Sequence, residues 1–268
     1  METFTFHPAI NRINYLDLSI YFYGFAKLDH QWHGDKCALP VNRLYIPKSG
    51  EAEISVGQQN VTMRPGYAYL VPADAPMDFH CDGQMEKLYF HFNIFRPDRY
   101  DVLSGLKEIY QIPFPADRYE RLFQHGQIGS MGDTMMIKAA IYDMLSQFQK
   151  RYQIINEEVP KYSKIVLSAI TYIQENLSAG LHLEDLAKHT FVARSTLADV
   201  FRKEVGVSLG KYIDDQLIAS AQRQLSQTGN SIGQISANLG YSNQCYFSRR
   251  FKQMSGVTPQ AYRTRNKV

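Results

Sequence analysis

Two short segments in the last third of the chain carry the side chains with the clearest chemistry. Gln244 and Arg249 lie on one predicted helix, and Arg194 and Arg202 lie on another. An amide side chain can pair with adenine through two hydrogen bonds, and a guanidinium can pair with guanine in the same way. These helices predict a surface that reads duplex DNA, with a solvated polar helix face as the alternative. The other candidates on the two helices are Ser195, Thr196, Ala198, Asp199, Asn243, Cys245, Ser248 and Lys252.

Four residues on or next to these helices have a more specific expected role. Asn243 is placed to cap the helix that follows it. Lys252, like Arg250, is expected to meet phosphate, which holds register without reading sequence. Asp199 can accept a hydrogen bond from cytosine N4, and pairing with a basic residue of its own helix is the alternative.

An internal repeat with an offset of 50 residues indicates which elements must position these side chains. Leu197 and Phe201 recur as Phe247 and Phe251, and a glycine follows five residues later in each copy. Since each apolar pair is four residues apart on a helix, both members face inward. A shorter apolar helix and a tight turn precede each copy. Two helix-turn-helix units are therefore predicted, at about 183–205 and 232–255.

A single helix at about 208–228 is predicted to join the two units. At 1.5 Å per residue its length is roughly 30 Å, close to the ~34 Å of one DNA turn. The two second helices could then enter consecutive major grooves on one face of the duplex. This part of the chain is also basic, with 13 Lys/Arg against 7 Asp/Glu from residue 163 onward. The part before it has 16 against 19, so the basic part is the one suited to a polyanion.

The first part of the chain has a β pattern. Short aromatic and β-branched runs recur at roughly ten-residue spacing, which predicts a sandwich or barrel. Around Asp98 the pattern becomes helical, with helices predicted at 117–124 and 133–152. The second of these is a candidate dimer contact, with burial against its own barrel as the alternative. The predicted strands are Leu18–Phe25, Arg43–Ile46, Glu53–Val56, Tyr67–Val71 and Lys87–Phe95.

Composition is typical of folded protein. The 268 residues are 44% apolar and 21% charged, which excludes a disordered or collagen-like chain. Cys37, Cys81 and Cys245 are odd in number and far apart, which excludes a disulfide scaffold and a CxxC site. The first twenty residues lack a signal-peptide pattern, and no apolar run approaches the ~20 residues that span a bilayer. We expect a soluble, cytoplasmic protein without a membrane partner.

One segment matches a known signature almost throughout. Its residues are Ile235-Ser236, Leu239 through Lys252 without a break, Gly256-Val257-Thr258-Pro259 and Tyr262-Arg263. The first unit matches less fully, through Leu186-Ala187, Leu197, Phe201-Arg202-Lys203-Glu204 and Gly206. On these residues the chain resembles the AraC-type (AraC/XylS) transcription regulators.

The resemblance implies a two-domain fold of the α+β multidomain class. Residues 1–155 would form a cupin-like barrel or sandwich, ending in helices, that binds an effector and dimerises. Residues 156–162 would be a linker, and 163–268 an all-α domain with two helix-turn-helix motifs joined by a helix. The implied function is ligand-responsive control of transcription, more often activation, of a carbohydrate-utilisation or related catabolic operon. The implied partners are double-stranded DNA, a small-molecule effector such as a sugar, a second copy of the chain and RNA polymerase.

The chain departs from the family pattern at two places. Ala193 replaces the usual Ser/Thr cap before the reading helix of the first unit. Leu217 stands in the connecting helix where the family usually has an arginine, and Asp214 and Asp215 replace commonly basic or polar residues. Our hypothesis is that the second unit supplies more of the base reading.

The first half offers aromatic and basic residues that could hold a small metabolite. On a strand Tyr89 and His91 share one face, opposite Leu88, Phe90 and Phe92. Ordinary barrel packing or an exposed position is the alternative for each candidate. The candidates are Trp32, His33, Arg43, Tyr45, Tyr69, His80, Tyr89 and His91.

A cupin metalloenzyme fused to a DNA-binding tail is a second class of function. Enzymes of this kind bind a divalent metal through a His-x-His pair, a glutamate and a later histidine. No His-x-His precedes Gly50, and Met77 occupies the position where the late histidine often falls. No Ser-His-Asp, P-loop or GxGxxG pattern is present, so the sequence predicts no enzyme, catalytic residue, metal or cofactor. A regulator without a small-molecule effector is the third alternative.

Overall fold

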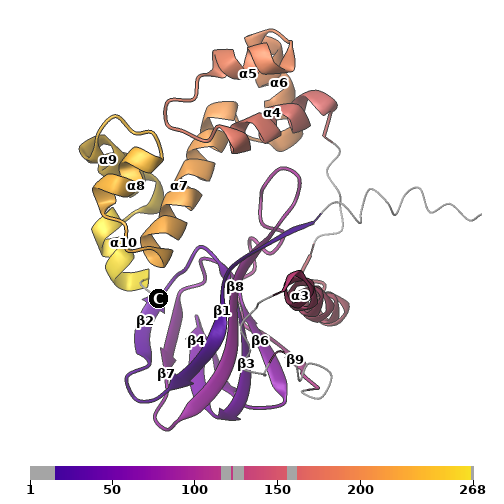
Figure 1. The fold of residues 1–268 in the computed structure, drawn as a ribbon, viewed down its shortest axis with the longest axis vertical. Coiled ribbons are helices and arrows are strands. Elements are labelled where there is room, and N and C mark those ends of the chain that lie inside the picture. The colour runs from indigo at the N-terminus through magenta and orange to yellow at the C-terminus, as the bar shows by residue number, and fades with distance from the viewer. Residues whose placement is uncertain (1–15, 116–121, 123–129, 156–161, 267–268) are drawn as a thin grey trace, which may run out of the picture. The chain divides into compact units, whose positions relative to one another are not determined.

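A computed structural model describes residues 16–115, 122, 130–155 and 162–266. The described chain divides into two compact units: 16–95 with 101–155, and 96–100 with 162–266. The first unit is built on β-sheets and the second on helices (Figure 1). The predicted helix at 117–124, except Leu122, and the predicted linker, except Tyr162, lie outside the described residues.

A five-stranded antiparallel sheet forms the centre of the first unit. Side chains alternate between its two faces, and both faces are buried: along β8, Leu88 and Phe90 belong to one core and Met85 and Tyr89 to another. Burial on both faces explains why β6 is a continuous apolar run. In spatial order the strands are β1 (Asp17–Leu28), β8 (Met85–Phe95), β3 (Asn42–Gly50), β6 (Tyr67–Val71) and β9 (Tyr110–Pro113).

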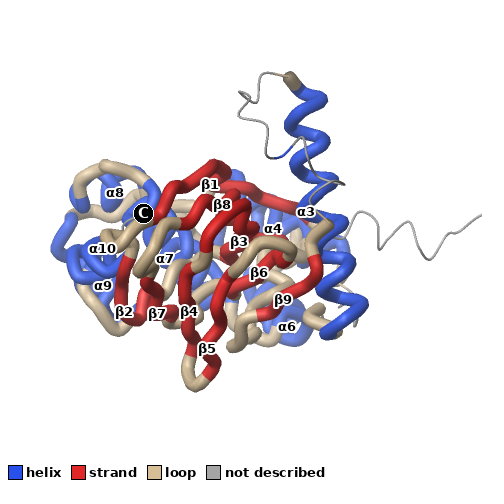
Figure 2. The backbone as a smooth tube through the Cα atoms, turned by 90° about the horizontal axis from the view of Figure 1, so that it is seen from below, coloured by secondary structure: helices blue, strands red, loops and turns tan. Residues whose placement is uncertain are grey.

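A second, four-stranded antiparallel sheet packs against one face of the first. Along β4 the side chains of Ala52, Ile54 and Val56 are buried, whereas Glu53 between them is exposed. The buried side chains meet Tyr45 and others of the first sheet in an inter-sheet core. The strand orders of both sheets can be followed in Figure 2. In this sheet the order is β2 (His33–Cys37), β7 (Met77–His80), β4 (Ala52–Val56) and β5 (Gln59–Met63).

Helix α3 (Met131–Tyr152) covers the other face of the five-stranded sheet. Ser130 caps it by accepting a hydrogen bond from the Asp133 amide at 3.1 Å. Ile141 and Phe148 of α3 are fully buried in one core with Phe90 of β8. The burial of this helix against its own sheet, one of the two alternatives from the sequence, is therefore observed.

The five strands predicted from sequence are confirmed within β1, β3, β4, β6 and β8, but the sequence did not predict β2, β5, β7 and β9. The expectation that the pattern turns helical around Asp98 is wrong, since β9 follows before α3. β9 has four residues and contains Pro113, so its own sequence has little strand signal. It forms because it pairs with β6 along the edge of the sheet.

The second unit is all helical in regular structure, and its long helix α7 (Leu209–Gln227) connects two groups of helices (Figure 1). At one end lie α4 (Lys164–Glu175), α5 (Leu183–Thr190) and α6 (Arg194–Val205). At the other lie α8 (Ile232–Asn238), α9 (Gln244–Ser255) and α10 (Pro259–Asn266). The segment 96–100 belongs to this unit, because the Tyr212 hydroxyl donates a hydrogen bond to the Asp98 main-chain oxygen at 2.8 Å.

Candidate functional site

Helices α6 and α9 hold the predicted reading residues, and they are equivalent in burial. Over twelve residues from Arg194 and from Gln244, the succession of exposed, half-buried and buried side chains is the same. Leu197 and Phe201 of α6, like Phe247 and Phe251 of α9, are fully buried. Each helix ends at a glycine in the left-handed conformation, Gly206 with φ 86° and Gly256 with φ 79°.

The exposed face of α9 carries the amide and guanidinium groups that the sequence singled out. Gln244, Cys245, Arg249 and Lys252 are exposed, and Ser248 is half-buried. Among the described residues, none forms a hydrogen bond or ion pair with the side chain of Arg249. Its guanidinium is therefore available to an acceptor outside the chain.

The first turn of α9 is fixed by a side-chain cap. Asn243 Oδ1 accepts a hydrogen bond from the Tyr246 amide at 2.8 Å, as the sequence predicts. This Asn243 oxygen therefore already accepts a hydrogen bond within the protein. Tyr246, the residue that matches Thr196 in the repeat, is 49% exposed beside Gln244 and Cys245. The sequence reasoning left Tyr246 out, although the offset of 50 residues would have identified it.

The exposed face of α6 differs in two ways. No side chain caps its start at Ala193. Arg194 Nη1 donates to Glu184 Oε1 of α5 at 2.6 Å, so the guanidinium already has an acceptor. Asp199 forms no ion pair with the described residues, and its pairing with a basic neighbour is not observed. Ser195, Thr196, Asp199 and Arg202 are exposed, and Ala198 is half-buried.

At the positions where the sequence departs from the family pattern, helix α7 carries a buried leucine and two half-buried aspartates. Leu217 is buried in the core of the unit. Asp214 forms an ion pair with Arg250 and so ties α9 to α7. This pairing raises the pKa of Arg250 above its ordinary value. Arg250 is half-buried, which leaves Arg249 as the more accessible of the two arginines.

The candidate ligand residues divide into two groups. Five lie on the inner face of the five-stranded sheet, and Trp32 packs beside them in the inter-sheet core. Because Leu88, Phe90 and Phe92 face α3 instead, the face carrying Tyr89 and His91 is the one enclosed between the sheets. The five residues are Arg43, Tyr45, Tyr69, Tyr89 and His91.

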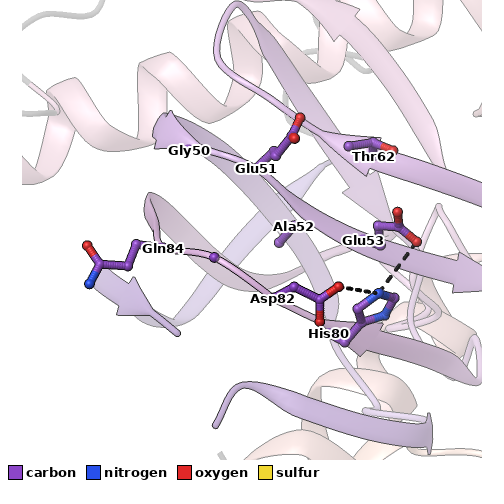
Figure 3. Close-up of a pocket in the computed structure, with 9 residues that line it drawn as sticks. Gly50, Glu51, Ala52, Glu53, Thr62, His80, Asp82 and Gln84 are labelled. Atoms are coloured by element: carbon purple, nitrogen blue, oxygen red, sulfur yellow. Dashed lines mark ion pairs between the residues drawn. The ribbon is translucent and has the colours of Figure 1, made fainter. Parts of the chain in front are cut away.

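His33 and His80 lie elsewhere, as exposed cross-strand partners of the four-stranded sheet. His80 borders an open hollow of about 260 Å³, where its Nε2 lies 3.6 Å from Glu53 Oε2 and 3.9 Å from Asp82 Oδ2 (Figure 3). Within the described ranges, no three His, Cys, Asp or Glu residues cluster so that they could hold a metal ion. The hollow is separate from the enclosed face.

Lys87 is the residue of this face that the sequence reasoning missed. Its Nζ lies over the rings of Tyr45 and Trp32, at 3.7 and 4.0 Å from their centroids. The strand period of two would have identified it, since Lys87 precedes Tyr89 by two residues and His91 by four. Lysine is rarely buried, so a lysine in a strand is ordinarily predicted to be exposed and not to line a ligand site.

Burial perturbs the basic groups on this face. It lowers the pKa of Lys87 well below its ordinary value, and the nearby charge of Arg43 lowers it further. The pKa of His91 falls to about 3 through burial and the charges of Arg43 and Lys87, so the imidazole is neutral at neutral pH. Burial raises the pKa of Tyr45 to about 12, which keeps its hydroxyl protonated.

Comparison with known proteins connects the helical unit to one family. A family model described as a helix-turn-helix domain matches residues 186–265. The transcriptional activator AarP of Providencia stuartii is 35% identical over 101 residues, which cover 38% of this chain and 75% of that protein. The chain belongs to the AraC family of transcription regulators.

Two relatives of this family match along most of the chain. The arabinose operon regulatory protein of Salmonella typhimurium is 29% identical over 234 residues, 82% of each chain. The Msm operon regulatory protein of Streptococcus mutans is 22% identical over 262 residues, 94% of each chain. The protein is thus a DNA-binding transcription regulator of the AraC family, and the N-terminal unit shares in the similarity. In the described part of the chain, no helix is long and apolar enough to cross a membrane.

Proposed function

We propose that α5–α6 and α8–α9 are two helix-turn-helix units that read consecutive major grooves, and that a small-molecule effector controls this reading. The observation that carries the proposal is the equivalence of α6 and α9, which share their order of exposed and buried residues over twelve positions. A helix that enters a groove needs one buried face and one polar exposed face, and each of the two helices has both.

The length of α7 supports the spacing of the two units. Its 19 residues correspond to about 28 Å at 1.5 Å per residue. Consecutive major grooves on one face of B-DNA are about 34 Å apart. A regulator with this spacing would contact two segments of its binding site, separated by about one helical turn.

We assign unequal roles to the exposed residues. Gln244 and Arg249 of α9 read bases, with Cys245 and Ser248 beside them, because their side chains leave the start of the helix on its exposed face. Lys252 and Arg202 meet phosphates, and Asn243 caps α9 next to the DNA. In α6 the residues proposed to read bases are Arg194, Ser195, Thr196, Ala198 and Asp199.

The test is selection of binding sites from random duplex DNA by the full chain, followed by affinity measurements on a selected duplex. We expect a bipartite site and an affinity that falls steeply with salt. Arg249→Ala should weaken binding about ten- to a hundredfold, since a bidentate arginine–guanine contact contributes ~1–3 kcal/mol. The control Lys164→Ala removes one exposed charge from α4, outside both reading helices, and should have little effect. A salt-independent interaction, or a site with a single contacted segment, would overturn the proposal.

The N-terminal unit is proposed as a cupin-like effector-binding and dimerisation domain spanning 1–155, followed by a linker at 156–162 and the DNA-binding domain at 163–268. The two facing antiparallel sheets support the first assignment. The name of one relative, the arabinose operon regulatory protein, supports control of a carbohydrate operon. A sugar or sugar derivative is therefore the proposed class of effector.

In this function the protein is not an enzyme and requires no cofactor. It would act as a homodimer in the bacterial cytoplasm, where the chromosome lies, and would activate transcription through RNA polymerase. The effector would bias an equilibrium between DNA-binding states, by no more than its difference in affinity for the two states.

A further inference from the structure

Three basic side chains are buried together on the inner face of the five-stranded sheet. Arg43, Lys87 and His91 are 0%, 3% and 5% exposed. Arg43 of β3 is the direct cross-strand partner of His91 on β8. Lys87 lies four residues before His91 on the same strand and therefore on the same face. The strand register thus brings three cationic or potentially cationic groups into one enclosed region.

The three basic groups lack an ion-paired carboxylate within the part of the chain that the structure describes. Among the described residues, no Asp or Glu forms an ion pair with Arg43 or Lys87. Asp101 is buried but already accepts hydrogen bonds from the side chains of Asn42 and Asn93 and from the Leu103 amide. Asp74 forms no ion pair with Arg43: burial raises the pKa of this carboxyl, and the charge of Arg43 lowers it by a smaller amount. Buried charges in proteins are ordinarily paired, and Arg43 lacks such a partner among the described residues.

Arg43 forms hydrogen bonds through its two terminal nitrogens, but not through Nε, with the described residues. Nη1 donates to the Cys37 carbonyl oxygen at 3.2 Å, and Nη2 donates to the Ala75 carbonyl oxygen at 3.0 Å. Arg43 Nε and His91 Nδ1 are buried without a partner among the described residues. Lys87 Nζ contacts two aromatic faces but no hydrogen-bond acceptor of the described chain. Unpartnered buried polar atoms are costly. A bound acceptor would satisfy Arg43 Nε, and also His91 Nδ1 in the tautomer that carries a proton on this nitrogen.

A purely structural role does not account for this arrangement. Replacing buried charged groups with apolar residues of similar volume is often neutral or stabilising, so a core gains little from them. The pKa of Lys87 and that of His91 are both lowered by burial and by the nearby charge of Arg43. A bound anion would reverse this effect for both groups.

We propose that the effector carries an anionic group, a carboxylate or a phosphate, that binds between the two sheets to Arg43, Lys87 and His91. The aromatic rings of Trp32, Tyr45 and Tyr89, which lie in the same core, contact the rest of the molecule. This inference rests on the proposed function, because it specifies the chemical class of the effector. It distinguishes acidic derivatives of sugars and similar small acids from neutral sugars.

Calorimetric titration of the full chain with matched sets of compounds tests the inference. The sets are galactose, galacturonate and galactose 6-phosphate, the same three forms of glucose, and benzyl alcohol with benzoate. We expect at least one acid to bind and its neutral parent to bind at least tenfold more weakly. Lys87→Met should weaken the binding of that acid by about ten- to a hundredfold, the size expected for loss of a charged hydrogen bond.

Lys48→Met is the matched control, since Lys48 is also a strand lysine of this sheet but its side chain is 43% exposed. It should leave acid binding unchanged. If Lys87→Met lacks a cooperative melting transition, His91→Phe replaces it and should produce the same loss.

Two results would overturn the inference. One is equal binding of neutral and acidic compounds that does not depend on Lys87, and the other is no Lys87-dependent binding of any acid in the panel. In either case the proposed function is judged separately, by binding of wild-type protein to a selected DNA duplex. Binding of neutral sugars alone would reject the anionic effector but retain an effector-responsive regulator.

Discussion

The two helix pairs of the C-terminal unit reach the same structure from different local signals. In the second pair, Ser231 forms a capping box at the start of α8, Gly240 takes the left-handed turn with φ 74°, and Asn243 caps α9. In the first pair, the corresponding ends have no side-chain cap at His182 and none at Ala193. The left-handed turn there is made by Phe191, with φ 57°. The first pair lacks all three signals that the second has.

This difference indicates that the burial of apolar side chains, rather than the capping residues at the helix ends, determines where these helices form. The order of exposed and buried residues is the same in α6 and α9 although their caps differ. Even the aromatic contacts repeat: the Phe201 and Tyr212 rings are 5.3 Å apart, and those of Phe251 and Tyr262 are 5.5 Å apart. The packing of an amphipathic face generally outweighs local propensity in determining helix stability.

The largest expected effect comes from removing the buried phenylalanine from each pair, which tests whether the two pairs are equally packed. Phe201→Ala and Phe251→Ala should each destabilise the helical unit by about 3–5 kcal/mol, since both rings are fully buried. The measurement is urea unfolding of the full chain followed by far-UV circular dichroism. A cost at Phe201 smaller by about 2 kcal/mol or more would show that the two pairs are not packed equally.

Exchange of the caps tests the difference between the pairs. Ala193→Asn should stabilise α6 by about 1 kcal/mol, because it supplies the missing acceptor for the first-turn amides. Asn243→Ala should cost α9 a similar amount. Hydrogen exchange of the two helices measures both effects locally. No gain at Ala193 together with no loss at Asn243 would mean that end signals have no part in either helix.

A smaller effect is expected at the left-handed turn of the first pair. Phe191→Gly should stabilise the unit by about 0.5–1 kcal/mol, because glycine relieves a conformation that costs other residues roughly 1–2 kcal/mol but adds chain entropy. The ring is 94% exposed, so little packing is lost. Phe191→Ala is the control: it removes the ring, keeps the strained conformation and should not stabilise. Equal effects of the two substitutions would exclude strain as the cause.

The sequence predicted those elements whose residues carry their own signal. β6 is an apolar run buried on both faces, β8 is rich in aromatic and branched residues, and α9 has its cap, its apolar spacing and its terminal glycine. β2, with the sequence His-Gly-Asp-Lys-Cys, could not be predicted because it forms by pairing at a sheet edge and not through strand propensity.

The same reasoning explains which site residues the sequence found. The exposed face of α9 follows from helical spacing, so Gln244 and Arg249 could be placed in advance. The pairing of Arg250 with Asp214 could not, since the two residues are 36 positions apart and meet only in the folded unit. Lys87 was missed because a charged residue in a strand is ordinarily taken to be exposed.

The two pairs also differ in how their first arginines are engaged. Arg194 of α6 is paired with Glu184, whereas Arg249 of α9 has no partner among the described residues. Exposed ion pairs contribute little stability, so Glu184 does not prevent Arg194 from meeting DNA, but it competes with a base for the guanidinium. Unequal reading by two equally packed helices is the central claim.

The most direct test compares Arg249→Ala and Arg194→Ala in the full chain on one selected duplex, with affinities measured by fluorescence anisotropy at fixed salt. We predict a loss of about ten- to a hundredfold at Arg249 and a clearly smaller loss at Arg194. A larger loss at Arg194 would contradict the claim, because it would make the first pair, with its paired arginine and uncapped helix, the main reader of sequence.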